Sequence, residues 1–284
     1  MTAVSDAFLV DAVGVSIPGE PITADPGLAG ELSATLADRD PEHLSGRRIT
    51  PLFNILPIYS CLFLAVDLVT PEEARPRIVH GAHDIRFVNP IRAGATLTAS
   101  ASVVGLRAVR AGVAISVRML VTDSRGTITS EQWASAIVRG ETRFTGAVGT
   151  AVPQVDLTPA SQQPAETTVL TPLTRDLPRR FADVSGDRHL IHLDDLAARR
   201  AGFDGAIMHG LCTMGLASSA VAETACRGRA ARLARLAARF TAPAYPSGTL
   251  TTTVRTLGGG RHEITAAGSD GTVVLRNALA EVAG

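Results

Sequence analysis

The sequence predicts an α+β protein built from two halves, each with an antiparallel sheet and an apolar helix against one face. Three observations lead to this prediction. Alternating or β-branched runs such as "GVAISVRMLVTD" and "TLTTTVRTL" are typical of strands. A long Ala- and Leu-rich segment without proline follows Gly210 and predicts a buried helix. Blocks of similar sequence recur in the same order in both halves, which indicates a tandem duplication.

The repeat is clearest where "RFVNPIRAGATLTASASV" from Arg86 aligns without a gap with "RFTAPAYPSGTLTTTVRT" from Arg239. Further on, "SRGTITSEQWASAIV" resembles "SDGTVVLRNALAEV", with a Gly-Thr pair at a hairpin-like turn in each. Upstream, "IVHG" at 78–81 echoes "IMHG" at 207–210. In the first half only "AHDI" separates this echo from the next block. The helix of that half is therefore either missing or supplied earlier, by the apolar segment 51–69.

A stretch rich in Gly, Pro, Gln, Ser and Thr separates the two halves and shows no sustained periodicity, as a domain connection would. We expect a first half at residues 1–146, a linker at 147–168 and a second half at 169–284.

The composition predicts a soluble protein with a well-filled core, because 45% of the 284 residues are apolar and 19% are charged. The formal net charge is zero, so we expect neither nucleic acid nor an anionic membrane as a partner. The most apolar segment, 51–66, is short for a membrane span and contains Pro57, which favours buried core. The three cysteines form no CxxC pair, and no basic region precedes the first apolar stretch, so we expect a cytoplasmic protein.

The densest polar stretch is "FADVSGDRHLIHLDD" at 181–195, followed shortly by "IMHGL". Asp187 and His192 lie five residues apart, about 500° around a regular helix, so a helix would not bring them together. A turn that opens a helix can point both side chains into one cleft. "SGD" predicts such a turn, and "HLDDLAARRAG" predicts a short helix with Asp194 in its first turn and Gly202 at its end.

The residues alone leave three interpretations of this stretch open. It can be a solvated loop whose aspartates cap a helix. It can be a metal site formed by His189 and His192 with Asp187 or His209, although the cysteines or clear third ligand typical of zinc are missing. It can be an acid–base pair, since a carboxylate and an imidazole facing one cavity suffice to move protons at neutral pH.

The stretch closely resembles the motif of the MaoC-like, (R)-specific enoyl-CoA hydratases, which runs approximately F-A-x-x-S-G-D-x-N-P-[LIV]-H-x-D and is followed by H-G. The matching positions are Phe181, Ala182, Ser185, Gly186, Asp187, His192, Asp194, His209 and Gly210. "RFTAPAYPSGTL" and "GTVVLRNALAEV" also resemble later strands of the family. "PLFNILPIYSCLFL" and "IVHGAHDIRFVNPIRAGATL" resemble the degenerate partner half of its double-hotdog members.

The resemblance implies a double hotdog, in which two antiparallel sheets, each wrapped around a helix, are fused in one chain. It also implies (R)-specific hydration of trans-2-enoyl thioesters, or the reverse dehydration of 3-hydroxyacyl thioesters. Asp187 and His192 would hold the water and divide the two proton transfers between them in a way that the sequence leaves open. Gly210 would donate its N–H to the thioester oxygen, a contribution commonly worth about 3–4 kcal/mol. The residues further expected near the substrate are Ser218, His189 and His209.

Two features depart from the family pattern. His189-Leu190 replaces the usual Asn-Pro, in which the Asn helps to hold the loop. The first half has His80-Gly81 but no Gly-Asp-five-His motif, so we expect one active site per chain, with the first half shaping the acyl pocket and with His80 and His83 serving structure. The implied reaction needs no metal and no redox cofactor. A duplicated chain can form by itself the pair that single-repeat members form as dimers, and a homodimer is compatible with this.

The expected partner is an acyl thioester of CoA or of an acyl carrier protein. A cluster of arginines is either a solvated helix face or a site for CoA phosphates or an acidic carrier protein; its members are Arg227, Arg229, Arg232, Arg235 and Arg239. The nearest alternative function is a MaoC-like biosynthetic enzyme that dehydrates, cyclises or adds to a carrier-bound polyketide or acyl intermediate. A hotdog thioesterase and a non-catalytic acyl-thioester-binding protein are further alternatives.

Overall fold

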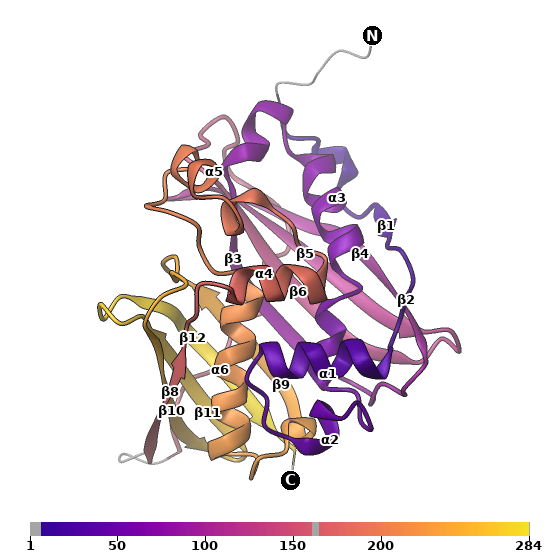
Figure 1. The fold of residues 1–284 in the computed structure, drawn as a ribbon. Helices are drawn as coiled ribbons and strands as arrows, with labels where there is room; N and C mark the ends of the chain where they lie inside the picture. The colour runs from indigo at the N-terminus through magenta and orange to yellow at the C-terminus, as the bar shows by residue number, and fades with distance from the viewer. Residues whose placement is uncertain (1–6, 161–164, 284) are drawn as a thin grey trace.

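The computed structural model describes residues 7–160 and 165–283, whose strands join in one twelve-stranded antiparallel sheet (Figure 1). The strands are β1 (Ser16–Pro18), β2 (Ile22–Thr23), β3 (Ile78–Phe87), β4 (Thr96–Val109), β5 (Gly112–Asp123), β6 (Ile128–Arg139), β7 (Ala147–Gly149), β8 (Glu166–Pro172), β9 (Leu233–Phe240), β10 (Thr249–Gly258), β11 (Arg261–Ala267) and β12 (Val273–Val282). The longest run of neighbours is β1-β4-β5-β6-β3-β9-β12-β11-β10-β8.

The strand order reveals the duplication directly. The sequence β4-β5-β6-β3 is followed by its mirror image, β9-β12-β11-β10, so the two halves meet where β3 pairs with β9. The matched turns also agree, because Gly126 and Gly271 both adopt φ +79° ahead of β6 and β12. Two such sheets, each against a central helix, form the double hotdog that the sequence predicts.

Six α-helices and five short 3₁₀ helices lie among the described residues. The α-helices are α1 (Pro26–Thr35), α2 (Pro41–Leu44), α3 (Tyr59–Val69), α4 (Leu177–Ser185), α5 (Asp195–Arg200) and α6 (Gly210–Thr224). The 3₁₀ helices are η1 (Val10–Ala12), η2 (Pro51–Ile55), η3 (Glu72–Arg77), η4 (Leu190–His192) and η5 (Ala230–Arg232).

Each half has its own central helix. In Figure 1, α3 lies along the first-half sheet, where it contacts β4 and β5, and α6 lies along the second-half sheet, where it contacts β9 to β12. The apolar segment 51–69 thus supplies the first-half helix, and the alternative of a missing helix is wrong. This segment is long and apolar enough to cross a membrane, but 67% of it is buried in the protein, as in a core helix.

One block of the predicted repeat is wrong. "IVHG" (78–81) lies within β3, whereas "IMHG" (207–210) runs through a loop into the first residue of α6. The structural partner of β3 is β9, as the gap-free alignment of Arg86 with Arg239 requires. The four-letter similarity therefore joins two segments with different positions in the fold.

The predicted linker is mostly irregular, but both of its ends belong to the sheet. Residues 147–149 form β7 on the edge of β4, and the last three residues of the linker lie in β8, which pairs with β10. Residues 161–164 lie outside the described part of the chain.

A buried ion pair joins the two halves at the β3–β9 seam. The guanidinium of Arg235 on β9 donates to both carboxylate oxygens of Asp84 on β3, at 2.9 and 2.7 Å, and also to Glu281 at 3.3 Å. A bidentate pair of this kind has strict geometry. It therefore fixes the register of the two half-sheets, between which the candidate site lies.

Candidate active site

The loop between α4 and α5 carries the polar motif. Helix α4 ends at Gly186, which adopts a left-handed conformation (φ +79°, ψ −2°) and donates its N–H to Ala182 O at 2.9 Å. Glycine is the residue that takes this conformation at least cost, so the turn predicted from "SGD" forms. The next N–H, of Asp187, donates to Ser185 Oγ at 3.2 Å, and the Asp187 side chain turns inward, with 8% of the residue exposed.

His192 follows at the end of η4 with a defined tautomer. Its Nδ1 lies 2.9 Å from Ile207 O, and because a carbonyl only accepts, Nδ1 carries the proton. Burial, and next the charge of His209, lower the pKa of His192 to about 3, although the Ile207 hydrogen bond raises it. The ring is therefore neutral at pH 7, and its Nε2 offers a lone pair to a reacting proton.

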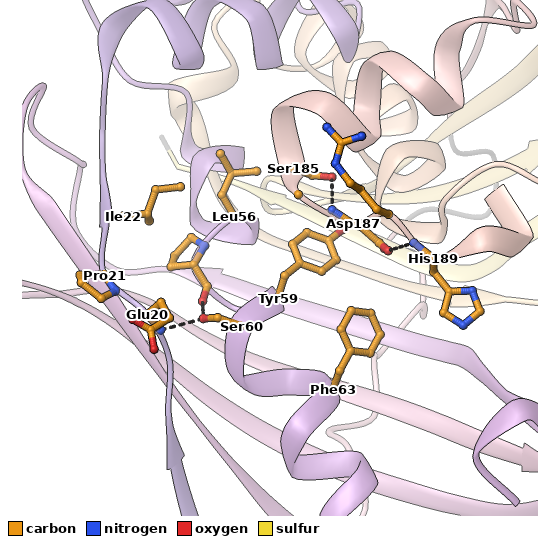
Figure 2. A pocket seen from close by; sticks show the side chains of 13 residues that line it. Glu20, Pro21, Ile22, Leu56, Tyr59, Ser60, Phe63, Ser185, Asp187 and His189 are labelled. Carbon is orange, nitrogen blue, oxygen red and sulfur yellow. Dashed lines mark hydrogen bonds between the residues drawn. The ribbon is translucent and has the colours of Figure 1, made fainter. Parts of the chain in front are cut away.

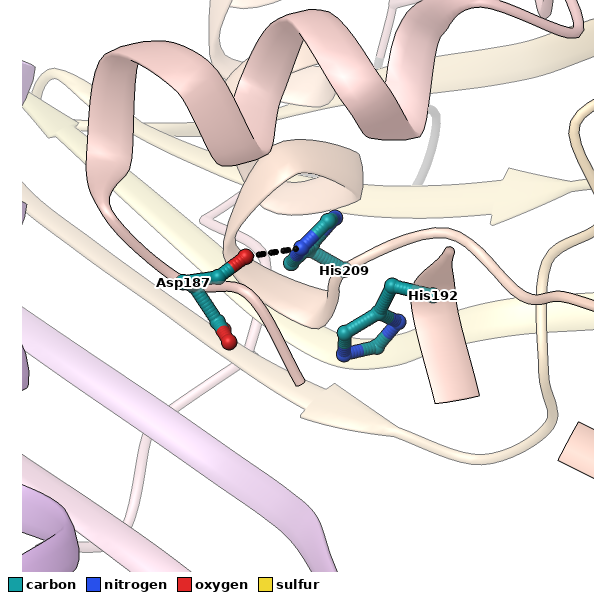
Figure 3. Close-up of side chains that lie close together, drawn as sticks. All are labelled: Asp187, His192 and His209. Atoms are coloured by element: carbon teal, nitrogen blue, oxygen red, sulfur yellow. Dashed lines mark hydrogen bonds between the residues drawn. The ribbon is translucent and has the colours of Figure 1, made fainter. Parts of the chain in front are cut away.

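His209 lies behind the pair and holds it. It is the N-cap of α6, is 1% exposed, and donates from Nε2 to the backbone carbonyl of Asp187 at 3.0 Å (Figure 3). Its ring stacks on His192 with centroids 3.8 Å apart and 28° between the planes. One buried imidazole thus fixes both the loop at Asp187 and the ring of His192.

These three residues could be considered as metal ligands, because ligand atoms of Asp187, His192 and His209 lie within 4.8 Å of one another. Their arrangement suits a metal poorly. Imidazole lone pairs lie in the ring plane, so two nearly parallel stacked rings do not aim them at one point, as a tetrahedral site needs. Two of the four ring nitrogens already donate to carbonyl groups. The arrangement instead favours proton transfer.

Gly210 is the first residue of α6, as the sequence predicts. The N–H groups of the first turn have no acceptor within the helix, and the helix dipole adds positive potential there. A side chain at this position would crowd Phe240, because a Cβ would lie 3.2 Å from its ring and the ring would have to move by a few tenths of an ångström. The structure thus presents a free amide N–H on a backbone that Phe240 covers closely.

A cavity of about 540 Å³ lies between the first half and the motif loop (Figure 2). Side chains of the first half, among them Ile22, Leu56 and Phe63, form its mostly apolar wall. Opposite them, Asp187 and His189 belong to the second half. Both halves are therefore needed to close this cavity around Asp187.

A second cavity, of about 710 Å³, is lined by His192. Its wall is more polar and contains charges of both signs, three arginines (Arg175, Arg179 and Arg199) and four aspartates (Asp194, Asp195, Asp204 and Asp270). Asp187 lines one cavity and His192 the other, so the two side chains lie where the cavities approach each other.

Comparison with known proteins agrees with this geometry. A model of the "MaoC like domain" family matches residues 156–277. The 3-hydroxyacyl-thioester dehydratase Y of Mycobacterium tuberculosis is 33% identical over 214 residues, which cover 72% of each chain. The chain belongs to the MaoC-like dehydratase family. Enoyl-CoA hydratase ChsH3 of the same organism is 26% identical to it over 211 residues, 71% of each chain.

Solved structures show that the MaoC-like fold spans the chain. A MaoC-like dehydratase from Phytophthora capsici superposes with a TM-score of 0.80 at 21% identity, covering 96% of this chain and 97% of the other. A conserved protein of Mycobacterium tuberculosis, described as a double hotdog, superposes with a TM-score of 0.65 at 16% identity and covers 96% of both. These two likenesses concern the fold alone.

The remaining predicted residues of this MaoC-like chain take different places. His189 lines the first cavity, and its Nδ1 accepts the N–H of Ile191 at 3.4 Å, which helps to hold the loop where the family uses Asn. Ser218 is 1% exposed within α6, and its hydroxyl has no partner among the described residues. It lines neither of the two cavities described here.

The predicted arginine cluster does not form one site. Arg235 is occupied by the buried ion pair with Asp84, so its assignment to phosphate binding is wrong. Arg227 and Arg229 are exposed beyond the last residue of α6, Thr224, roughly 22 Å along the helix from its start. The arginines close to the pair are instead those of the second cavity, which the sequence analysis missed because they are scattered along the chain.

Two histidines of the first half, His80 and His83, form their own network, whereas His43 pairs with Asp38 at 2.8 Å. A bulge at Gly81 turns His80 and His83 to the same side, and His83 bonds to His80 at 3.2 Å and to Gln132 at 2.9 Å. Burial lowers the pKa of His80 to about 3 and that of His83 to about 4. His83 is 1% exposed and uses both ring nitrogens, which fits a structural role.

One residue that faces the motif was not found from the sequence. Tyr59, the first residue of α3, lines the first cavity from the opposite half and points toward Asp187 (Figure 2). It stands in the apolar run "PLFNILPIYSCLFL", where a tyrosine is indistinguishable from core. Only the packing of the two halves brings it to the site.

Proposed function

We propose that the protein catalyses (R)-specific hydration of trans-2-enoyl thioesters, or the reverse dehydration of 3-hydroxyacyl thioesters. Relatives named 3-hydroxyacyl-thioester dehydratase and enoyl-CoA hydratase support this class of reaction. The observation that carries the proposal is a neutral His192, whose Nε2 is the free nitrogen, beside the inward-facing carboxylate of Asp187.

In the hydration direction, the pair binds a water molecule. One member of the pair removes a proton from it as its oxygen bonds to Cβ, and the pair then passes that proton on to Cα, so that it returns to its starting protonation state. The C=C electrons move toward the thioester, so negative charge develops on its oxygen. The N–H of Gly210 at the positive end of α6 stabilises this charge. Dehydration follows the same steps in reverse, and neither direction requires a metal or a redox cofactor.

The two cavities hold different parts of the substrate. The acyl group occupies the cavity between the halves, whose wall is largely apolar. The carrier, CoA or the phosphopantetheine of an acyl carrier protein, extends through the second cavity. There Arg175 and Arg179 are exposed cations that suit phosphate groups, provided that these groups stay clear of the four aspartates of the same wall. The reaction takes place where the thioester lies between the two cavities. The expected location of the enzyme is the cytoplasm.

A biosynthetic reaction on a carrier-bound intermediate is the second candidate. It is favoured by the replacement of the usual Asn-Pro by His189-Leu190, because His189 adds an imidazole to the acyl cavity. It is also favoured by the exposed residues Glu20 and Pro21 at the edge of that cavity, which leave room for a substrate larger than a simple fatty acyl chain.

The test measures the loss of conjugated thioester absorbance with crotonyl-CoA and with a longer trans-2-enoyl-CoA. Wild type is compared with Asp187→Asn and His192→Ala. Matched controls are Asp11→Asn and His262→Ala, which change the same residue types outside both cavities. We expect the two site variants to lose at least about 100-fold in rate and the controls to keep wild-type rates.

The outcomes separate the proposals. Formation of (R)-3-hydroxyacyl-CoA that depends on both site residues supports the hydratase. No turnover by folded wild type on either substrate refutes it and directs the search to carrier-bound intermediates. Thioester binding that persists in Asp187→Asn, without turnover in any variant or on any carrier, identifies a binding protein.

A further inference from the structure

Tyr59 places a buried, unsatisfied hydroxyl beside the catalytic loop. It starts α3 in the half that lacks the Asp/His motif, and its ring stacks on Phe63 with centroids 6.1 Å apart. Its oxygen is fully buried and has no hydrogen-bond partner among the described residues. A buried polar group without a partner is costly, and among the seven side chains with such an atom in the described residues Tyr59 is the one that lines either cavity, so its position calls for a ligand.

The surroundings of this hydroxyl indicate what the ligand is. Tyr59 lines the same cavity as Asp187, and burial, together with the negative charge of Asp187, keeps the pKa of the phenol well above its ordinary value. The phenol is therefore protonated at neutral pH and remains a donor. Asp187 is close enough to exert this effect, but no hydrogen bond joins the two side chains.

A donor on one side and a carboxylate on the other suit an oxygen that both accepts and donates. Of the substrate oxygens, the one that reacts at Cβ is of this kind, because it must also lie against Asp187. The thioester oxygen only accepts, and it is assigned to Gly210 in α6.

We propose that Tyr59 is a substrate-binding residue supplied by the first half, whose hydroxyl donates a hydrogen bond to the oxygen that is added at Cβ. That oxygen belongs to water in hydration and to the 3-hydroxyl group in dehydration. This inference rests on the proposed hydration reaction and adds a specific contact to it.

The hydrogen-bond inventory of the water is then complete. Its two hydrogens go to the Asp187 carboxylate and to His192 Nε2, one lone pair accepts from Tyr59, and the other lone pair attacks Cβ. During attack, one hydrogen passes to the pair and the oxygen–carbon bond forms. In dehydration the same donor stabilises the negative charge that develops on the departing oxygen, before that oxygen takes a proton from the pair.

The kinetic test compares Tyr59→Phe with wild type, since phenylalanine keeps the ring and its stacking on Phe63. Thr70→Val is the matched control, because it removes a hydroxyl from the other end of α3, where Thr70 bonds to Val66 O at 2.7 Å. We expect Tyr59→Phe to lower kcat/KM for crotonyl-CoA by about 10- to 100-fold and Thr70→Val to leave it unchanged. Circular dichroism and Tm verify that both variants fold.

A second readout separates a ligand contact from a structural role. The chain has two tyrosines, so ¹³Cζ-tyrosine labelling gives two signals, which Tyr245→Phe assigns. In the His192→Ala background, (R)-3-hydroxybutyryl-CoA is expected to shift the Tyr59 signal, whereas butyryl-CoA, which lacks the hydroxyl, is expected to leave it in place.

Two results overturn the inference: a Tyr59→Phe rate within twofold of wild type, or equal shifts with the two ligands. Failure of the proposed function is distinguishable, because it removes turnover from wild type itself. In that case the two-ligand comparison still decides whether Tyr59 contacts a 3-hydroxyl group.

Discussion

The N–H of Gly210 can be removed with little change to the surrounding backbone, which allows its proposed role to be tested by Gly210→Pro. Gly210 is the first residue of α6, the position where helices tolerate proline because the lost N–H has no acceptor within the helix. The preceding residue, His209, already has φ −61° and ψ 137°, within the region that a residue before proline prefers. The helix and the loop are therefore expected to keep their conformation.

The proline adds carbon atoms as well as removing a hydrogen, so a control must carry the same steric load. Gly210→Ala carries the part of that load that meets Phe240, because its Cβ would lie 3.2 Å from the ring and would force the ring to move by a few tenths of an ångström. Alanine retains the N–H. The ratio of the two variants therefore reports the loss of the N–H together with the added Cγ and Cδ, and loss of one donor to a developing oxyanion commonly costs about 100- to 1,000-fold in kcat, roughly 2.7–4 kcal/mol.

The assay is steady-state hydration of crotonyl-CoA, with circular dichroism and Tm on each variant. Phe240→Leu is combined with both substitutions to relieve the contact with the ring. We expect Gly210→Ala to recover activity in this background and Gly210→Pro to stay inactive. Equal rates for alanine and proline at position 210 would refute the assignment of this N–H to the thioester oxygen.

Three further predictions concern stability. Burial lowers the pKa of His83 from 6.5 to about 4, so below about pH 6.5 the unfolded chain takes up a proton that the folded protein does not. The contribution of His83 to stability is therefore full above about pH 6.5 and falls by up to about 3 kcal/mol by about pH 4. Burial also lowers the pKa of His80 and of His192, so in urea titrations His83→Gln should remove only the share of the acid-induced loss that His83 contributes. Gly215→Ala should lower the free energy of unfolding by about 1–3 kcal/mol, although alanine has the higher helix propensity, because the new Cβ would lie 2.7 Å from the side chain of buried Leu36. Adding Leu36→Ala should offset this loss in the double variant. Asp84→Asn should lower the free energy of unfolding by about 3 kcal/mol, because it leaves Arg235 without its main partner. A loss below about 1 kcal/mol would show that the β3–β9 seam does not depend on this ion pair.

Local rules explain which parts of the site could be predicted. Gly186 ends α4 in a left-handed conformation, Asp194 caps α5 by accepting Ala197 N–H at 2.7 Å, and Gly210 starts α6. Each of these depends on neighbours within a few positions in the chain. The same locality explains why the five-residue spacing of Asp187 and His192 could be assigned to a turn.

Contacts between distant segments could not be predicted in this way. The stacking of His192 on His209 depends on how the loop crosses the start of α6, so a residue expected at the substrate proves to lie behind the pair. Tyr59 reaches Asp187 across more than a hundred residues of sequence. The similarity of "IVHG" to "IMHG" misled because four residues carry too little information to separate a strand from a helix start.

The mirror order of the strands gives the helix starts a common position and suggests how the halves came to differ. α3 precedes β3 as α6 precedes β9, so Tyr59 and Gly210 each begin the central helix of their half. In the second half a Cβ at this position would lie 3.2 Å from the Phe240 ring, so glycine is the residue that leaves the ring undisturbed. In the first half Phe87 aligns with Phe240, yet the helix begins with a tyrosine in place of glycine. That tyrosine points across the cavity toward Asp187 of the second half.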